Sequence, residues 1–223
     1  MRSFCAALLI PLLATAHAAD TPALDPSKNT EIGLVYESWL SPMQEPDEEA
    51  NTPAKTPDRF KSTAPSQTRE ERVAANHRAH AVVRFTNDLS KAYVDIALEG
   101  VKIEDINMFH IHCGTPGVLG PILVDFSLIT NIQDNFKDGV FSVEVNNAAI
   151  AGTAAQAHDA VGAFTLGCVI PSPSLGTAKP TKVSTVAGMA AIAQEGDLYF
   201  NLHTKGQTYY GDIRGQWGPA DDE

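Results

Sequence analysis

The sequence predicts an all-β fold, an antiparallel β-sandwich with short helical excursions. Short apolar segments recur along the chain, and within them apolar and polar residues alternate with the period of two that strands have. Turns rich in glycine and proline separate these segments at short intervals, which is typical of sandwiches. Apolar residues make up 43% of the 223 residues, enough for a substantial core. We expect one domain, over residues 31–217.

The expected strands and helices follow one another along this domain. Segment 79–86 shows the alternation clearly, since Ala81, Val83 and Phe85 face one side of the strand and His80 the other. The other expected strands are 31–40, 92–98, 106–113, 122–128, 140–145, 198–204 and 209–216. Helices are expected at 68–78, at 148–160 with Asn146 or Asn147 as N-cap, and at 184–194, ending before Gly196.

Residues 1–18 have the pattern of a secretory signal peptide, so we expect a secreted, extracellular protein. The positively charged Arg2 precedes the apolar residues 4–14, a stretch that is too short to span a bilayer, and small residues follow it. Cleavage after Ala18 fits the pattern best. Cleavage after Ala16 also fits, and it would leave His17 as an N-terminal copper chelator.

Three further segments differ in composition from the domain. Residues 19–30 are polar, and we expect them to be loose. Residues 41–67 form an acidic excursion with five prolines, which we expect to be solvated and to be cut first by proteases. Residues 218–223 form an acidic tail that we expect to be frayed.

The formal net charge of −11 excludes some classes of partner. Nucleic acids and anionic membranes bind clustered positive charge, so we expect neither as a partner. After the signal peptide, no apolar run approaches the roughly 20 residues that a membrane-spanning helix needs.

Two cysteines, Cys113 and Cys168, remain after removal of the signal peptide. An even pair in an oxidising compartment usually forms a disulfide, and we expect one here. The alternative is two separate buried thiols.

Two histidines lie one residue apart in the strand expected at 106–113. His110 and His112 therefore face one side of the sheet, while Phe109 and Ile111 face the other. The strand thus offers an apolar face for the core and a pair of imidazoles on the opposite face.

A second strand with a histidine on its polar face is expected at 198–204. Tyr199, Asn201 and His203 share one face, and Leu198, Phe200 and Leu202 share the other.

Four motifs in this order resemble the CHRD domain, the module repeated in the chordin family. They are Gln44-Glu45-Pro46, His110-Ile111-His112-x-Gly114 with the following Gly120-Pro121, Leu198–Thr204, and Gly211-Asp212-Ile213-Arg214-Gly215-Gln216. The sequence departs from the family pattern in its long Pro-rich excursion, in Asp212 where glutamate is usual, and in the long segment between residues 145 and 198. The resemblance implies an immunoglobulin-like or superoxide-dismutase-like sandwich. It implies no settled activity.

The family layout places the two histidine strands near each other, which predicts a metal site. Three neutral imidazoles from His110, His112 and His203 with an open position suit Zn²⁺ or Cu²⁺. His80 and His77 are candidate additional ligands. The alternative is that the histidines only order a polar sheet face by hydrogen bonds and that the protein has no cofactor.

Three further polar residues are candidates for support around this site. Asn201, Asp212 and Arg214 are expected in its second shell. A buried Arg214–Asp212 ion pair is expected to fix the last strand, and anion binding by Arg214 is the alternative.

The histidine face needs a cover. Ile106 and Met108 are expected to share that face, so it cannot lie open to solvent. The 41–67 excursion or the 184–194 helix is expected to cover it.

The sequence leaves three functional hypotheses. The first is a secreted, non-catalytic CHRD protein that binds a metal ion, an extracellular partner or a small molecule. The second is a small extracellular enzyme that uses the same histidine face, as a copper redox centre or as a cofactor-free cyclase or isomerase of a secondary-metabolite pathway. The third is a structural or cell-surface protein whose acidic excursion makes the contact.

Overall fold

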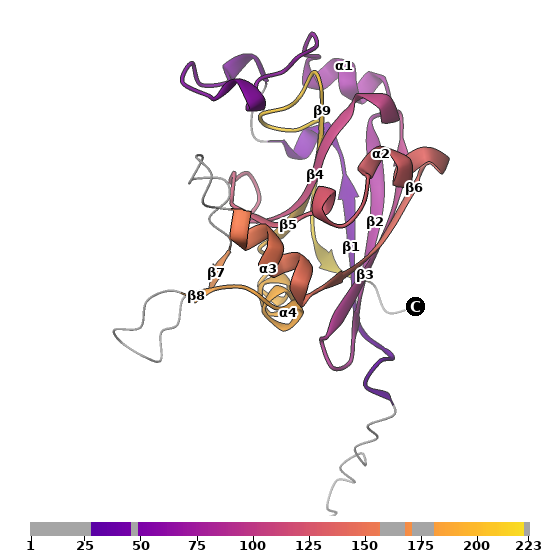
Figure 1. Ribbon diagram of the computed structural model, residues 1–223. Coiled ribbons are helices and arrows are strands. Elements are labelled where there is room, and N and C mark those ends of the chain that lie inside the picture. Colours follow the sequence, from indigo (N-terminus) through magenta and orange to yellow (C-terminus); the bar gives the residue numbers. More distant parts are fainter. Residues whose placement is uncertain (1–27, 46–48, 157–167, 171–180, 221–223) are drawn as a thin grey trace, which may run out of the picture.

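Two antiparallel sheets pack face to face around one apolar core, as the sequence predicts (Figure 1). The computed structural model describes residues 28–45, 49–156, 168–170 and 181–220. The five-stranded sheet has the order β11-β1-β2-β3-β6, and the four-stranded sheet has the order β10-β9-β4-β5. The strands are β1 Ile32–Leu40, β2 Arg78–Thr86, β3 Lys91–Glu99, β4 Ile106–Cys113, β5 Ile122–Asp125, β6 Val140–Asn146, β9 Leu198–Thr204, β10 Ile213–Gln216 and β11 Gly218–Pro219, with β7 Val169–Ile170 and β8 Thr181–Lys182 paired separately.

Short helices connect these strands. The α-helices are α1 Arg69–Ala74, α2 Ile132–Asn135, α3 Asn147–Gln156 and α4 Val186–Gln194, and the 3₁₀ turns are η2 Pro42–Gln44, η3 Glu49–Asn51, η4 Asp58–Phe60, η5 Ile103–Asp105, η6 Phe126–Leu128 and η7 Phe136–Asp138. Asn146 caps α3 as predicted, because its side-chain oxygen accepts hydrogen bonds from the backbone N–H groups of Ala148 and Ala149 in the first turn. Gly196 follows α4 with φ of 76°, the left-handed conformation that ends a helix. No helix in the described ranges is long and apolar enough to cross a membrane.

Two expected strands are shorter than the sequence suggested. β5 ends at Asp125, whose carboxylate accepts hydrogen bonds from the backbone and hydroxyl of Ser127 and so starts a 3₁₀ turn. β10 begins only at Ile213, because Gly211 has a φ of 114° that no strand residue adopts.

The histidine strands β4 and β9 are antiparallel neighbours. His110 lies opposite Asn201, and Met108 lies opposite His203. The expectation that Ile106 shares the histidine face is wrong, because a β-bulge between Ile106 and Met108 shifts the alternation and turns Ile106 into the core.

The excursion at 41–67 is not simply solvated. Its Glu49 is only 7% exposed, and the Glu49 carboxylate accepts hydrogen bonds from the backbone of Tyr209 and Tyr210 and from the hydroxyl of Ser62. The backbone N–H groups of Thr63 and Ala64 both donate to the carbonyl of Lys205. The excursion therefore packs against the loop after β9, where Figure 1 shows the two segments side by side.

Other expectations fall at the ends of the chain. The signal peptide, most of the 19–30 segment and residues 221–223 lie outside the described residues. The start of the 218–223 tail is not frayed, since Gly218 and Pro219 pair with β1 as β11. The expected disulfide is present, linking Cys113 at the end of β4 to Cys168 with a Cα–Cα distance of 5.9 Å.

Candidate metal centre

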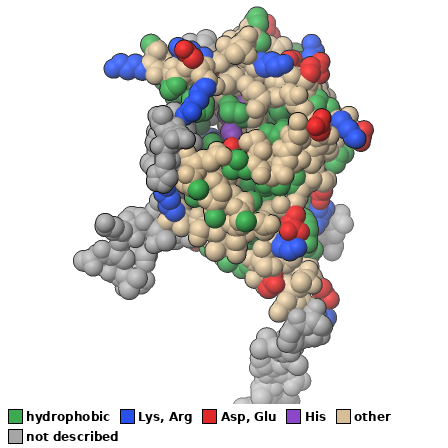
Figure 2. Space-filling model, viewed as in Figure 1, with side chains coloured by type: hydrophobic (Ala, Val, Ile, Leu, Met, Phe, Trp, Pro, Cys, Tyr) green, Lys and Arg blue, Asp and Glu red, His purple; other side chains and the backbone are tan. Residues whose placement is uncertain are grey.

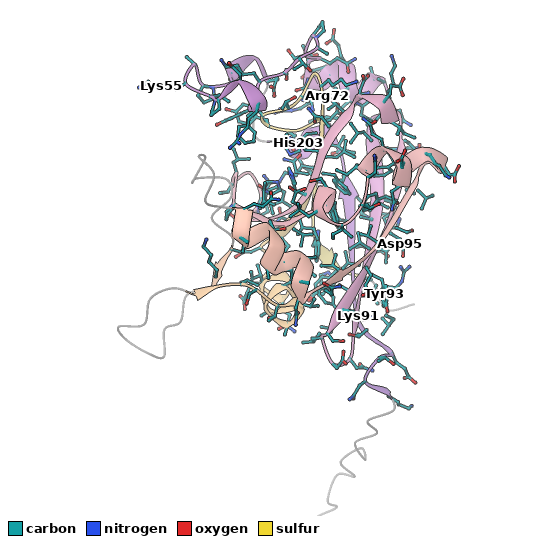
Figure 3. The ribbon with its side chains drawn as sticks, viewed as in Figure 1. Lys55, Arg72, Lys91, Tyr93, Asp95 and His203 are labelled. Atoms are coloured by element: carbon teal, nitrogen blue, oxygen red, sulfur yellow. A yellow bond between two sulfur atoms is a disulfide. The ribbon has the colours of Figure 1, made fainter. Side chains whose placement is uncertain are left out.

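His110, His112 and His203 meet on the outer face of the four-stranded sheet, away from the apolar core. Their ring centroids are 5.2 Å (His110–His203), 5.3 Å (His110–His112) and 6.3 Å (His112–His203) apart. One ligand atom from each ring lies within 4.8 Å of the other two. All three side chains are buried, with at most 4% of each residue exposed. Figure 3 shows His203 on this face, beneath the segment that carries Lys55.

Two backbone carbonyls determine which ring nitrogen of His112 and of His203 carries the proton. Nδ1 of His112 lies 2.9 Å from the carbonyl oxygen of Gly120, and Nδ1 of His203 lies 3.0 Å from that of Thr208. A carbonyl only accepts hydrogen bonds, so each Nδ1 must donate. Each Nε2 then presents a bare lone pair, and neither Nε2 has a hydrogen-bond partner within the described part of the chain.

His110 is held differently. Its Nε2 lies 3.9 Å from a carboxylate oxygen of Asp125 on the neighbouring strand β5, which is too far for a hydrogen bond. Its buried Nδ1 has no partner among the described residues. The ring of His110 is therefore available to an additional ligand or ion.

Burial keeps these imidazoles neutral. It lowers the pKa of His112 to about 3 and that of His203 to about 4, and it holds the pKa of His110 well below 6.5. Repulsion among the rings lowers the pKa of His110 and His112 further. Neutral imidazole is the form that binds metal ions.

A cavity of about 470 Å³ opens beside the three rings. Figure 2 shows histidine atoms inside a hollow on this face of the molecule. Besides the histidines, its walls comprise Arg59, Phe60, Met108, Leu119, Ile122, Asp125, Gln156, Thr208 and Tyr209. The excursion covers the site as expected, because η4 supplies Arg59 and Phe60. No residue of α4 lines the cavity, so of the two expected covers it is the excursion, and not the 184–194 helix, that borders the site.

The predicted Arg214–Asp212 ion pair does not form. Arg214 donates instead to the carbonyls of Thr115 and Val118 and to the side chain of Gln216. The Asp212 carboxylate accepts from the hydroxyl of Thr204 and pairs with His77 at 2.6 Å. Arg214 completes the hydrogen bonds of a loop, and this leaves Asp212 to other partners.

Arg214 supports the site through an aromatic ring. Its guanidinium lies 3.5 Å from the ring centroid of Tyr199, and that ring stacks on His112 with centroids 5.0 Å apart and planes 9° apart. The hydroxyl of Tyr199 also accepts a hydrogen bond from the backbone of Gly120, the residue whose carbonyl holds His112.

The remaining candidates bond to groups other than the three rings. His80 is on the outer face of the five-stranded sheet, where it stacks on Trp39 at 4.0 Å and faces Glu37 at 3.3 Å. It is therefore not placed to be an additional ligand. His77 pairs with Asp212. Asn201 lies opposite His110 in the β4–β9 pair, and its side-chain amide donates to the carbonyl of Tyr210.

Sequence reasoning missed several residues of the site. Backbone carbonyls such as those of Gly120 and Thr208 carry no signal in the side-chain pattern. Tyr199 falls on the predicted histidine face, and its position two residues from Asn201 was the available signal. Arg59 and Phe60 were missed because the excursion was expected to be solvated.

Comparison with known protein families gave a match to the CHRD domain over residues 61–217. Comparison with curated proteins and with solved structures gave no match. The matched region covers more than half of the chain and includes all three histidines of the site. The chain therefore belongs to the CHRD domain family.

Proposed function

We propose that this protein is an extracellular CHRD domain that binds one Zn²⁺ or Cu²⁺ ion through His110, His112 and His203. One observation carries the proposal: carbonyl hydrogen bonds fix two of the rings so that buried, bare nitrogens are left among the three. Metal-binding histidines commonly donate their other ring nitrogen to a carbonyl or carboxylate in this way.

The spacing suits a single ion. Metal–nitrogen bonds of about 2.0–2.1 Å place the ligand atoms of one ion at most about 4.2 Å apart. The ligand atoms here lie within 4.8 Å of one another, so side-chain movements of less than about 1 Å would bring them to bonding distance. Burying a ring nitrogen without a hydrogen-bond partner costs free energy. A bound metal ion would give the unpartnered nitrogens of these buried rings a partner.

An extracellular location agrees with two features. The disulfide between Cys113 and Cys168 is stable in oxidising compartments, and CHRD domains are typically extracellular binding modules.

Metal analysis of the purified, secreted protein tests the proposal. We expect one equivalent of Zn²⁺ or Cu²⁺ in the wild type after loading and dialysis. His112→Ala and His203→Ala should each lose stoichiometric binding while keeping the fold, because the apolar face of the sheet is unchanged. His80→Ala is the matched control, since it removes a histidine from the other sheet, and it should bind like the wild type. Equal metal content in all four proteins would contradict the proposal.

A second candidate function is an extracellular enzyme, and the cavity beside the histidines is the observation that favours it. A copper redox centre at this site would consume oxygen when copper-loaded protein is given ascorbate, and His112→Ala would abolish the uptake. A cofactor-free cyclase or isomerase would instead keep its activity in metal-free protein. Oxygen uptake no faster than that of the His112→Ala variant would rule out the redox form.

A further inference from the structure

We infer that the cavity beside the three histidines binds a small organic anion, with an oxyanion on the metal and an apolar body between Leu119, Ile122 and Met108. The inference rests on the proposed metal site and adds the chemistry of the ligand.

The open coordination position of a bound ion would face the cavity. The three rings are attached to β4 and β9, and the sheet behind them leads to the apolar core. The cavity borders all three rings on the side away from that core. A fourth ligand of a bound ion therefore has to enter from the cavity.

The charge around a bound ion favours an anionic ligand. Three neutral imidazoles leave a divalent ion with its full charge of +2. Among the described residues that line the cavity, Asp125 is the single carboxylate and Arg59 the single cation. The charge of +2 on a bound ion by itself exceeds the single negative charge of Asp125, so an anionic oxygen donor suits the site better than a neutral one.

Much of the cavity wall is apolar. Apolar surface of the cavity comes from the excursion (Phe60), from β4 (Met108), from the loop before β5 (Leu119) and from β5 itself (Ile122). Such surface favours a ligand with an apolar body. The volume of about 470 Å³ lies within the range of roughly 300–1,000 Å³ in which proteins bind small organic molecules. A bare inorganic anion would leave most of it unfilled.

Titration of the cobalt-loaded full-length protein tests this inference, because the absorption spectrum of Co²⁺ reports ligands that bind to the ion itself. Benzoate, acetate and the neutral benzamide are the probes. We expect benzoate to bind at least about tenfold more tightly than acetate, because its ring buries apolar surface. Benzoate should also bind at least about tenfold more tightly than benzamide, which has the same shape and no charge.

Two variants locate the binding surface. Leu119→Asn places an amide in the apolar wall and should weaken benzoate binding about tenfold while leaving acetate binding unchanged. Val118→Asn is the matched control, because Val118 is 50% exposed and does not line the cavity, and it should bind both acids like the wild type.

The outcomes separate the inference from the proposed function. If none of Co²⁺, Zn²⁺ and Cu²⁺ binds, the proposed metal site is wrong and the inference fails with it. If Co²⁺ binds but benzoate is no tighter than acetate, the metal site stands and the inference is wrong. Equal effects of Leu119→Asn and Val118→Asn on benzoate binding would also overturn it.

Discussion

At the scale of single residues, hydrogen bonds to backbone carbonyls make the three histidines of β4 and β9 a candidate metal site, because they leave Nε2 of His112 and of His203 without a proton. Tyr199 links several of these interactions, because it stacks on His112, lies against Arg214 and accepts the backbone proton of Gly120. A β-carbon at Gly120 would overlap the carbonyl of Cys113, so only glycine fits where the carbonyl for His112 is needed.

Tyr199→Phe should weaken metal binding without removing a ligand. The variant keeps the stack on His112 but loses the acceptor for Gly120, so the carbonyl that orients His112 is less well held. Changes in such supporting groups typically lower metal affinity 10- to 100-fold, and we expect a loss of about tenfold. Isothermal titration with Zn²⁺ measures it. Tyr36→Phe, which removes a hydroxyl from the other sheet, should leave the affinity unchanged, and an equal loss in both variants would contradict the role of Tyr199.

Glu45 gives a prediction about pH. Burial raises the pKa of its carboxyl from 4.5 to about 8, although Arg214, Arg72 and Arg69 act to lower it and Asp212 to raise it. Between pH 4.5 and 8 the unfolded chain has lost this proton and the folded protein keeps it, so the folded state binds more protons. The contribution of Glu45 to stability is therefore full below pH 4.5 and is lost as the pH rises to about 8.

Urea unfolding of the wild type and of Glu45→Gln at pH 5, 6.5 and 8 measures this contribution. Glutamine does not titrate, so the free energy of unfolding of the wild type minus that of the variant should fall steadily as the pH rises. A difference that stays constant or increases with pH would show that Glu45 is ionised in the fold.

At the scale of elements, alternation along the strands was enough to predict which faces β4 and β9 turn to the core. Phe109 and Ile111 are fully buried in the core, and the histidines lie opposite. Ile106 was assigned to the wrong face because a bulge depends on pairing with β9, which side-chain alternation within one strand does not reveal.

The excursion was misjudged for a different physical reason. Its composition is polar and proline-rich, so it has little apolar surface to bury. Glu49 nevertheless fixes it, because a carboxylate can satisfy several backbone donors of another loop at once. The amino-acid composition of a segment indicates how much apolar surface it can bury. It does not indicate which hydrogen bonds a single carboxylate makes to another loop.

Glu49→Ala should release the excursion from the loop after β9. Trypsin should then cut after Arg59 or Lys61 much faster than in the wild type, because the hydrogen bonds to Tyr209, Tyr210 and Ser62 are lost. Limited proteolysis followed by mass spectrometry measures the rates. Glu31→Ala, at an exposed glutamate, is the control and should not change them. Fast cleavage at these sites in the wild type would restore the view of a loose excursion.

At the scale of the whole molecule, the fold is larger than the region that matches the family. The match begins at residue 61, yet β1 precedes it and lies between β11 and β2 in the five-stranded sheet. Gln44 accepts a hydrogen bond from the backbone of Gln216, and Tyr36 and Leu40 lie in the core. Residues before the matched region therefore belong to the same domain.

The sequence predicted this architecture better than it predicted the chemistry. Strand alternation and the pair Cys113–Cys168 follow from residue types alone, and both agree with the structure. The predicted ion pair between Arg214 and Asp212 was wrong, because Arg214 reaches a neighbouring loop instead. The position of that loop depends on the whole fold and not on the alternation within one strand. Residue types predicted which histidines meet, and the fold adds which of their nitrogens are available to a metal ion.

Anomalous diffraction from crystals of the zinc- or copper-loaded protein tests the central claim most directly. We expect one strong metal peak at about 2.0–2.1 Å from one nitrogen of each of His110, His112 and His203, with Nε2 as the ligand atom of the last two. No peak among these three rings, or a peak bound only at His80 or His77, would contradict it.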